Sequence, residues 1–478
     1  MSDKEMEVQR HGMMFLVSSA GITLVGFLAT IFYAHWVGPE VLGLYFLFIS
    51  YLAILGLFSD LGIGYAATQR ICSGVDPHEF FTTGLTLRLG LFGLISTVII
   101  VFRDYFADLN SSGLLLVLLA VFGMSTFSSS ITVAISASNR LGLAASVSLL
   151  NNITRICVQV VAVFLGYQVY GLIGGLIAGL IVEIVIQVKF IDYHLKKFRW
   201  AHVKSIFSFS TWAVLTSAGS VFFDNISLII IAYFLPVSEV GIFGICWTFS
   251  VFALFISTAL VNTLYVKVSR WNAEKDMNTI AVSLSRATTY SLIFALPILI
   301  GGIILGHDLL YYLYGASFAT GATALVIIIA MRGIQSILNL YTNFLMATDH
   351  TKQAVAGILA GVSANIILCV ILIPYIGIAG AATGAFVNVI ISVCITRVYL
   401  AKIIPVFLEK TAIKHMVFAT MVMTISLLIL GWLPLDHNKF QIFLMVLVGA
   451  AVYFIVLLKL NKQLRDDAFR TLKITWIS

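Results

Sequence analysis

The apolar residues of this chain form long continuous runs separated by short polar connections. Each run is long enough for a helix that crosses a hydrocarbon layer of about 30 Å. We therefore predict an all-α polytopic membrane protein with about fourteen transmembrane helices. Their expected limits are 13–36, 41–66, 82–103, 112–137, 146–166, 170–190, 206–234, 240–265, 281–305, 321–346, 354–373, 377–400, 414–433 and 440–460.

A turn at Gly38-Pro39 separates the first two runs. Proline fixes its own φ and has no N–H for a helix ladder, so a Gly-Pro pair favours a reversal of the chain. The second run contains one acid, Asp60, and ends at Arg70. The stretch from Tyr33 to Arg70 is thus expected to form a transmembrane hairpin.

The pattern of this hairpin returns after about 198 residues. The corresponding residues are Pro39 and Pro236, Glu40 and Glu239, Gly43 and Gly241, Arg88 and Arg286, and, at a larger offset, Gly171 and Gly377, and Gly174 and Gly380. A repeat of this length in hydropathic sequence is typical of transporters built from two homologous bundles. We expect two pseudo-symmetric six-helix lobes at residues 1–200 and 201–405, followed by two additional spans and a tail at 406–478.

The composition agrees with a membrane protein. Of the 478 residues 60% are hydrophobic and 10% are charged, whereas soluble proteins are about 25% charged. The net charge of +7 does not indicate nucleic-acid binding, because the basic residues gather on one side of the predicted membrane. The five cysteines lack metal-binding spacing and are expected to be small buried hydrophobes.

The distribution of Lys and Arg predicts the orientation. Connections on one side contain Arg70, Arg140, Lys196, Lys197, Arg199, Lys204, Lys267, Arg270, Lys275, Lys352, Lys402 and Lys410. Connections on the other side contain only Arg103 and Lys439. Because basic loops stay inside, both termini are expected to be cytoplasmic and the protein to lie in the cell membrane.

The predicted connections leave no room for a catalytic domain. The longest outer connection, at 307–320, has about 14 residues, a length typical of a loop. The chain contains no nucleotide-binding glycine loop, no histidine pair of metal-binding type and no serine elbow. We therefore expect neither enzymatic activity nor a resident cofactor or metal.

Four arginines lie five or more residues from either end of a predicted span: Arg88, Arg155, Arg286 and Arg332. Each charge at a helix centre costs at least about 2.5–3.5 kcal/mol, so two explanations compete. In one, each arginine pairs with an acid, as Arg88 can with Asp60, since both lie roughly 9 Å deep on consecutive helices. In the other, all four bind an anionic guest, because guanidinium matches phosphate oxygens in pairs. The second is favoured for the last three. Near Arg286 the positions equivalent to Asp60 are Ser257 and Thr258, and Arg332 has no acid in its own span or the next.

The intramembrane acids raise the question of energy coupling. A carboxylate in a span can hold H⁺ or Na⁺ during transport. Asp60, Asp224, Asn365 and Thr383 are the candidate coupling residues, since oxygen ligands suit a hard cation. Asp224 is equally consistent with a hydrogen-bonded anchor between helices. Glu183, near the inner end of its span, is expected to reach the interface or to pair with Lys189.

Four segments resemble the polysaccharide-exporter branch of the multidrug/oligosaccharidyl-lipid/polysaccharide transporter superfamily. They are Gly38-Pro-Glu-Val-Leu-Gly-Leu-Tyr, Phe58-Ser-Asp-Leu-Gly-Ile-Gly, Ala137-Ser-Asn-Arg and Tyr170-Gly-Leu-Ile-Gly-Gly. The resemblance implies two lobes that rock about a cationic cavity, with two further helices beside the lipid tail. Two features depart from lipid II flippases. The first predicted span has no arginine, the nearest being Arg10, and Cys369 stands where those relatives have a second acid.

The resemblance implies a flippase that moves a polyprenyl-(pyro)phosphate-linked oligosaccharide from the cytoplasmic to the outer leaflet by alternating access. Its expected partners are that glycolipid, membrane lipid, and a glycan polymerase or glycosyltransferases. Three alternatives remain open. They are a cation-coupled multidrug exporter of the same fold, a membrane-embedded glycosyltransferase or polymerase, and a scaffold or scramblase. Basic charges in the cavity favour the flippase over the exporter.

Overall fold

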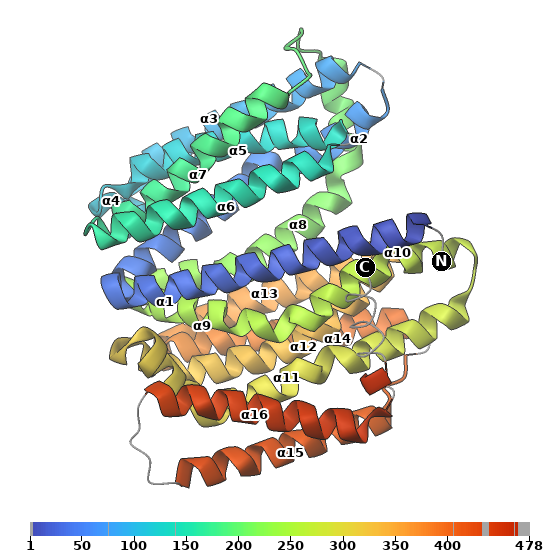
Figure 1. Ribbon diagram of the computed structural model, residues 1–478. Helices are drawn as coiled ribbons and strands as arrows, with labels where there is room; N and C mark the ends of the chain where they lie inside the picture. Colours follow the sequence, from blue (N-terminus) through green and yellow to red (C-terminus); the bar gives the residue numbers. More distant parts are fainter. Residues whose placement is uncertain are drawn as a thin grey trace. The chain divides into compact units, whose positions relative to one another are not determined.

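The computed structural model describes residues 3–74, 76–138, 140–404, 406–432, 439–462 and 464–466. Within these ranges the side chains of residues 3–20, 22, 141, 205, 207–213 and 216 are not described. Asn139 of the third resembling segment, the Arg10 side chain and the tail after Asp466 therefore lie outside the described parts. All regular structure in the described ranges is helical (Figure 1).

The helices pack as two compact units, which meet in the sequence between Gly244 and Ile245. The first contains α1 (Asp3–Asp60), α2 (Ile63–Cys72), α3 (Pro77–Val101), α4 (Ala107–Ser111), α5 (Leu114–Ala137), α6 (Leu141–Phe164), α7 (Gln168–Phe190), α8 (Trp200–Phe234) and the start of α9 (Val237–Ser250). Helices α3, α5, α6 and α7 run side by side in Figure 1. The lobes expected at 1–200 and 201–405 rest on sequence repetition rather than on packing and stay a prediction.

Within the described residues, thirteen helices are long and apolar enough to cross a membrane. The first of them, Thr23–Asp60, contains the predicted turn. Gly38 there has φ 72° and ψ −179°, a non-helical conformation that joins two helices across a kink. A positive φ suits glycine, which has no Cβ to clash. Dividing this helix at Gly38 gives fourteen spans, in agreement with the sequence.

The second predicted span, 41–66, is broken in the structure. Helix α1 ends at Asp60, and α2 begins at Ile63. Leu61 and Gly62 between them have φ values of 39° and 73°. The break leaves helical N–H groups without ladder partners, and the Gly64 N–H donates to Asp60 Oδ1 at 2.9 Å. Non-helical backbone at membrane depth is tolerated only inside protein or beside a cavity.

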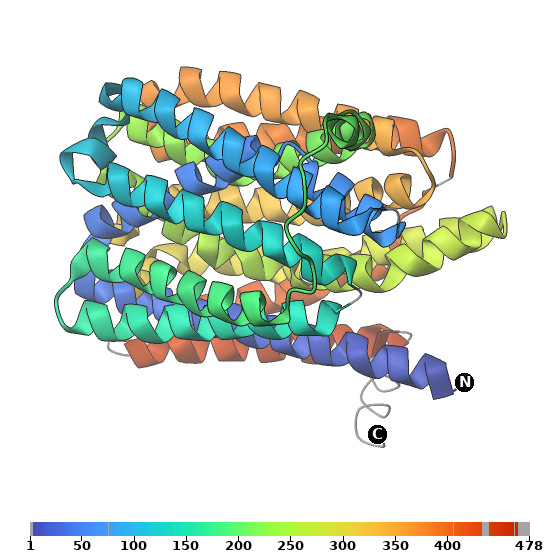
Figure 2. The same cartoon turned by 90° about the horizontal axis from the view of Figure 1, so that it is seen from above.

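The second unit contains the end of α9 and seven further α-helices. They are α10 (Phe255–Ala273), α11 (Met277–Tyr314), α12 (Ala322–Ala347), α13 (Thr351–Ile376), α14 (Ile378–Ala401), α15 (Lys410–Trp432) and α16 (Lys439–Leu460). The yellow-green turn between α10 and α11 projects beyond its neighbours in Figure 2. Helices α15 and α16 pack on α11, where Tyr453 Oη donates to the Ile293 carbonyl at 2.8 Å.

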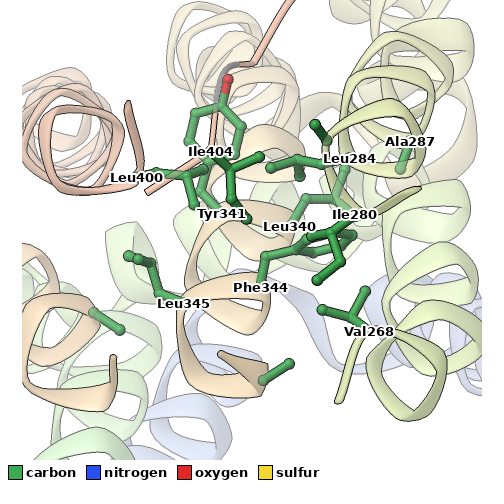
Figure 3. Packing of buried hydrophobic residues seen from close by; sticks show 13 residues of the cluster. Val268, Ile280, Leu284, Ala287, Leu340, Tyr341, Phe344, Leu345, Leu400 and Ile404 are labelled. Carbon is green, nitrogen blue, oxygen red and sulfur yellow. The ribbon is translucent and has the colours of Figure 1, made fainter. Parts of the chain in front are cut away.

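A buried apolar cluster joins α10, α11, α12 and α14 of the second unit and includes Ala354 of α13 (Figure 3). Val268 of α10 and Ile280 of α11 lie beside Leu340 and Phe344 of α12, and Leu400 closes the cluster from α14. Between helices in lipid the attraction comes from close packing rather than from escape from water. The cluster therefore holds α10, α11, α12 and α14 in fixed register.

The α6–α7 and α13–α14 hairpins repeat the same packing. A Cβ on Gly175 would lie 2.8 Å from the carbonyl oxygen of Arg155, and one on Gly384 would lie 3.3 Å from that of Asn365. In the same way, a Cβ on Gly171 would collide with Ala162, and a Cβ on Gly380 would collide with the backbone of Leu372. Arg155 and Asn365, predicted to bind substrate and cation respectively, thus occupy corresponding places.

The register expected for these hairpins, Gly171 with Gly377 and Gly174 with Gly380, is wrong. Gly377 instead forms the turn before α14, with φ 61°, and a Cβ on Gly174 would meet nothing within 4 Å. The connection between α13 and α14 is shorter than that between α6 and α7. Sequence similarity at the turn therefore aligns residues that lie in different places in the helices.

Candidate functional site

A cavity of about 420 Å³, lined by both polar and apolar groups, lies within the first unit. It opens beside the break between α1 and α2 and is lined from α3, α5 and α7 as well. Its lining residues are Asp60, Gly64, Tyr65, Thr68, Arg88, Ser125, Ser128, Ser129, Thr132, Val133, Leu180 and Glu183. This cavity brings Asp60 and Arg88, both predicted from the sequence, together with Glu183.

Asp60 and Arg88 form an ion pair. Asp60 Oδ1 lies 2.5 Å from Arg88 Nη2, and the Arg88 side chain is only 9% exposed. Arg88 Nη1 also donates to Ser130 Oγ at 3.1 Å. The pairing expected from their equal depth is thus confirmed. The charge on Arg88 is balanced in this conformation.

Glu183 is held by amide groups rather than by a cation. Asn151 Nδ2 of α6 donates to Glu183 Oε2, and Gln187 Nε2 donates to Glu183 Oε1 at 2.9 Å. The predicted ion pair with Lys189 is wrong, because no such pair is present in the described part of the chain. The i,i+4 spacing of Glu183 and Gln187 was the sequence signal for the actual arrangement.

Gln187 fixes the polar wall between α5 and α7. Its Nε2 also donates to Thr132 Oγ1 at 2.8 Å, while Ser128 Oγ donates to its Oε1 at 3.2 Å. A buried amide with partners on both sides orients its neighbours. The carboxylate of Glu183 and the hydroxyls of α5 are therefore pre-positioned around the cavity.

Arg155 lies in the same unit but outside the lining of this cavity. Its Nη2 donates to Asn152 Oδ1 at 2.8 Å, and it makes no ion pair with a described carboxylate. One turn away, Gln159 Nε2 donates to Tyr45 Oη at 2.9 Å, and Tyr33 Oη donates to Gln159 Oε1 at 3.1 Å. This amide–phenol network ties α6 to α1 and supports the helix that carries Arg155.

Arg332 is the most buried of the four arginines, at 3% exposure. Its Nε donates to Ser250 Oγ at 3.1 Å and its Nη1 to Gln335 Oε1 at 2.7 Å. The guanidinium carbon lies 4.2 Å from the centre of the Trp247 ring, a cation–π contact. Trp247 was missed because its role depends on the packing of α9 against α12.

Arg286 has an acid beside it, contrary to expectation. Its Nε lies 3.6 Å from Glu409 Oε1, with side chains 49% and 34% exposed. The expectation considered only acids in adjacent spans, whereas Glu409 precedes α15, more than a hundred residues later. Arg88 and Arg286 thus correspond in sequence but take their carboxylates from different elements.

The predicted coupling residues do not form one cluster in the described contacts. Asn365 is fully buried on α13, where its Oδ1 accepts from Cys369 Sγ at 3.2 Å. Thr383 Oγ1 donates to the Ala379 carbonyl of its own helix, α14, at 2.8 Å. Asp224 is exposed on α8 of the first unit, and Asp60 belongs to the ion pair above.

The comparisons identify the family. A family model described as "Polysaccharide biosynthesis protein" matches residues 33–323. The chain belongs to this family. It is similar to the "Probable low-salt glycan biosynthesis flippase Agl15" of Haloferax volcanii, with 25% identity over 98% of this chain and 99% of that one. It is also similar to the "Probable flippase AglR" of the same organism, with 24% identity over 93% and 94%.

The fold of this family member is similar to that of a solved structure of "Lipid II flippase MurJ, inward closed conformation". The TM-score is 0.74 at 16% identity, covering 95% of this chain and 99% of that one. The resemblance expected from the sequence and the all-α polytopic fold class are thereby confirmed. The protein is a multi-pass membrane protein.

One group of residues on the polar end of α3 has the composition of a metal site. Donor atoms of Asp76, Glu79 and His202 lie within 4.8 Å of one another. However, Glu79 Oε2 already lies 3.1 Å from Arg199 Nε and 3.2 Å from His202 Nε2. A guanidinium on the central carboxylate opposes a second cation. The contacts of Glu79 with Arg199 and His202 therefore fit a structural link between the start of α3 and the start of α8.

Proposed function

We propose that this protein is a flippase that moves a polyprenyl-(pyro)phosphate-linked oligosaccharide from the cytoplasmic to the outer leaflet. The observation that carries this proposal is the relationship to the polysaccharide biosynthesis family, together with a relative over nearly the whole chain whose name is a glycan biosynthesis flippase. The MurJ-like fold agrees with it.

The arginines supply the chemistry that a pyrophosphate needs. Moving a charged diphosphate and several hydroxyls through hydrocarbon is prohibitive unless their lost hydration is replaced. Arg155 has no carboxylate partner among the described residues and belongs to the first unit. Arg332 is buried and belongs to the second unit. Guanidinium groups bind phosphate oxygens in pairs, so these two are the first candidates for phosphate contacts. Arg286 can bind phosphate if it leaves Glu409. The ion pair between these two residues is partly exposed, and such pairs contribute little stability.

In this proposal the substrate loads from the cytoplasmic side and leaves on the other by alternating access. Both termini are cytoplasmic, in line with the basic connections. Coupling to H⁺ or Na⁺ through Asp60, Asp224, Asn365 and Thr383 belongs to the proposal too. The partners are membrane lipid and the enzymes that make or polymerise the glycan. The protein itself is a transporter and performs no covalent chemistry.

A multidrug exporter of the same fold is the second candidate. The cavity of the first unit favours it, because Asp60 and Glu183 outnumber Arg88 there. Acids in a cavity attract cationic drugs. The two functions differ in the sign of the charge carried across the membrane, so one experiment separates them.

The test is transport by purified protein in proteoliposomes, with a fluorescent polyprenyl-pyrophosphate oligosaccharide and, separately, a cationic dye. We expect the glycolipid to be flipped, and Arg155→Ala and Arg332→Ala to lower its rate at least about tenfold, or about 1.4 kcal/mol. Arg397→Ala is the matched control, since Arg397 is an exposed span arginine whose Nη1 donates to Tyr341 Oη at 3.1 Å. Dye transport without glycolipid flipping would overturn the proposal.

A further inference from the structure

The size of the cavity in the first unit restricts what it binds. Its volume of about 420 Å³ falls in the range of about 300–1,000 Å³ that is usual for pockets binding small organic ligands. A bare metal cation requires oxygen ligands on all sides within about 2.6 Å. One cation or proton would leave most of this space filled by water. The space fits a polar organic group of the size of one or two sugar rings.

The lining groups match a polyhydroxylated ring. Six hydroxyl-bearing side chains line the cavity: Tyr65, Thr68, Ser125, Ser128, Ser129 and Thr132. Each of the Ser and Thr hydroxyls already donates to a protein oxygen. Toward the cavity these hydroxyls therefore act as acceptors for the O–H or N–H groups of a sugar. The apolar side chains of Val133 and Leu180 also face the cavity, and such groups suit the C–H faces of a pyranose. Such a mixture is typical of a pre-formed ligand pocket.

The charges of the cavity are unequal. Arg88 is balanced by Asp60 at 2.5 Å. Glu183 receives only the neutral amides of Asn151 and Gln187 in the described contacts. The formal charges of the lining residues therefore sum to −1, and Gln187 holds the carboxyl group of Glu183 in place. A carboxylate in this setting accepts hydrogen bonds from hydroxyls or an ammonium group and repels another carboxylate.

We propose that this cavity is a sugar subsite that accepts a neutral or amino hexose of the glycan head group and rejects a uronic acid. The inference rests on the proposed function in that the sugar is part of the transported glycolipid. It goes further, because it assigns the sugar to the first unit and the selectivity to Glu183. The arginines outside the cavity bind the phosphates, and the acids inside it bind the ring.

Binding of free sugars tests the subsite without transport. Saturation-transfer NMR on the full-length protein in nanodiscs compares glucose, glucosamine and glucuronate, which share one ring and differ in charge. We expect glucosamine and glucose to receive saturation and glucuronate to bind at least about tenfold more weakly. Glu183→Gln should reduce the ratio of glucosamine to glucuronate affinity about tenfold, equivalent to about 1.4 kcal/mol.

Two further variants keep the test interpretable. Ser129→Ala removes a lining hydroxyl that is bonded, among the described residues, only to the Thr126 carbonyl, retains all charges, and should weaken all three sugars by a similar factor. Glu274→Gln is the matched control, because Glu274 is an exposed acid whose Oε1 lies 2.9 Å from Arg270 Nε. It should leave every affinity unchanged. An unchanged sugar ratio in Glu183→Gln, or no saturation of any sugar by the wild type, would overturn the subsite.

The two proposals fail in different ways. Selective sugar binding without glycolipid flipping would refute the proposed function and retain the subsite. Flipping of neutral-sugar and uronic-acid glycolipids at equal rates, unaffected by Glu183→Gln, would refute the subsite and retain the flippase. Binding of Na⁺ to the cavity, detected by ²³Na NMR and abolished in Glu183→Gln while sugars have no effect on it, would also refute the subsite.

Discussion

Gly43 and Gly241 pack reciprocally within the first unit. A Cβ on Gly43 would lie 1.9 Å from the carbonyl oxygen of Val237, and a Cβ on Gly241 would lie 2.0 Å from that of Pro39. Each of these carbonyls is four residues before the opposite glycine. Reciprocal contacts of this kind follow from a two-fold relation. The hairpin repeat expected from the sequence is therefore visible as a local symmetry at these two glycines.

We predict that this crossing does not tolerate a side chain. Gly43→Leu or Gly241→Leu must push backbone away from backbone, and overpacking costs about 1–3 kcal/mol. Both variants should lower the thermal unfolding temperature in detergent and reduce glycolipid flipping. Gly56→Leu is the control on the same helix, since a Cβ there meets nothing within 4 Å. Equal stability of all three variants would contradict the tight crossing.

The buried ion pair in the cavity yields a second prediction. Asp60→Asn leaves the guanidinium of Arg88, which is 9% exposed, without its carboxylate. Removing one partner of a fully buried pair costs about 3–5 kcal/mol, and a smaller loss is expected here because the Asp60 side chain is 32% exposed. The double variant Asp60→Asn/Arg88→Met removes both charges and should recover much of the lost stability. Thermal unfolding of the two single variants and the double variant in detergent measures this coupling.

A positive coupling energy of at least about 1 kcal/mol is expected from this cycle, as is usual for residues in contact. Additive effects would mean that Asp60 and Arg88 act independently. Flipping rates of the double variant also test the coupling role predicted for Asp60. Retained dependence on an ion gradient in that variant would exclude Asp60 from coupling.

A third prediction concerns Arg286. Its pair with Glu409 is half exposed, and such pairs contribute about 0–1 kcal/mol. Glu409→Gln should therefore change the unfolding temperature little and leave flipping intact or faster, because it frees the guanidinium. Arg286→Ala should slow flipping if that group binds phosphate. Equal losses in both variants would indicate that the pair is structural.

The sequence predicts the spans well because the membrane imposes length and hydrophobicity on each helix separately. It also offers the Asp60–Arg88 pair as one of two explanations for Arg88, since both residues lie on consecutive helices at matched depth. It does not reveal Glu409 beside Arg286 or Trp247 beside Arg332, because those contacts depend on how distant elements pack. The break at Leu61–Gly62 was hidden as well, since the apolar run continues through it.

The register of the second repeat failed for a related reason. The equal spacing of Gly171 and Gly174 and of Gly377 and Gly380 suggested an alignment that differs from the helix contacts. The contacts of Arg155 and Asn365 with Gly175 and Gly384 give the register of the hairpins directly. An arginine and an asparagine at corresponding places make the two hairpins chemically different. That difference is expected if Arg155 of the α6–α7 hairpin contacts phosphate and Asn365 of the α13–α14 hairpin takes part in cation coupling.

The start of α11 gives the last prediction, which concerns pH. The Thr279 N–H donates to Asp276 Oδ1 at 3.1 Å, and Thr279 Oγ1 donates to Asp276 Oδ2 at 2.6 Å. These hydrogen bonds lower the pKa of the Asp276 carboxyl below its usual value. A group with a depressed folded pKa stabilises the fold above its unfolded pKa, and this contribution is lost as pH falls through the folded pKa. The cap should therefore loosen below about pH 4.

Hydrogen exchange of the amides in the first turn of α11, corrected for intrinsic rates, measures this effect. In the wild type we expect protection to fall as the pH is lowered from 6 to 3. Asp276→Asn retains a capping oxygen but cannot titrate, so its protection should be nearly independent of pH. Asp276→Ala removes the cap and should show low protection throughout. A pH response that persists in Asp276→Asn would assign it to another group.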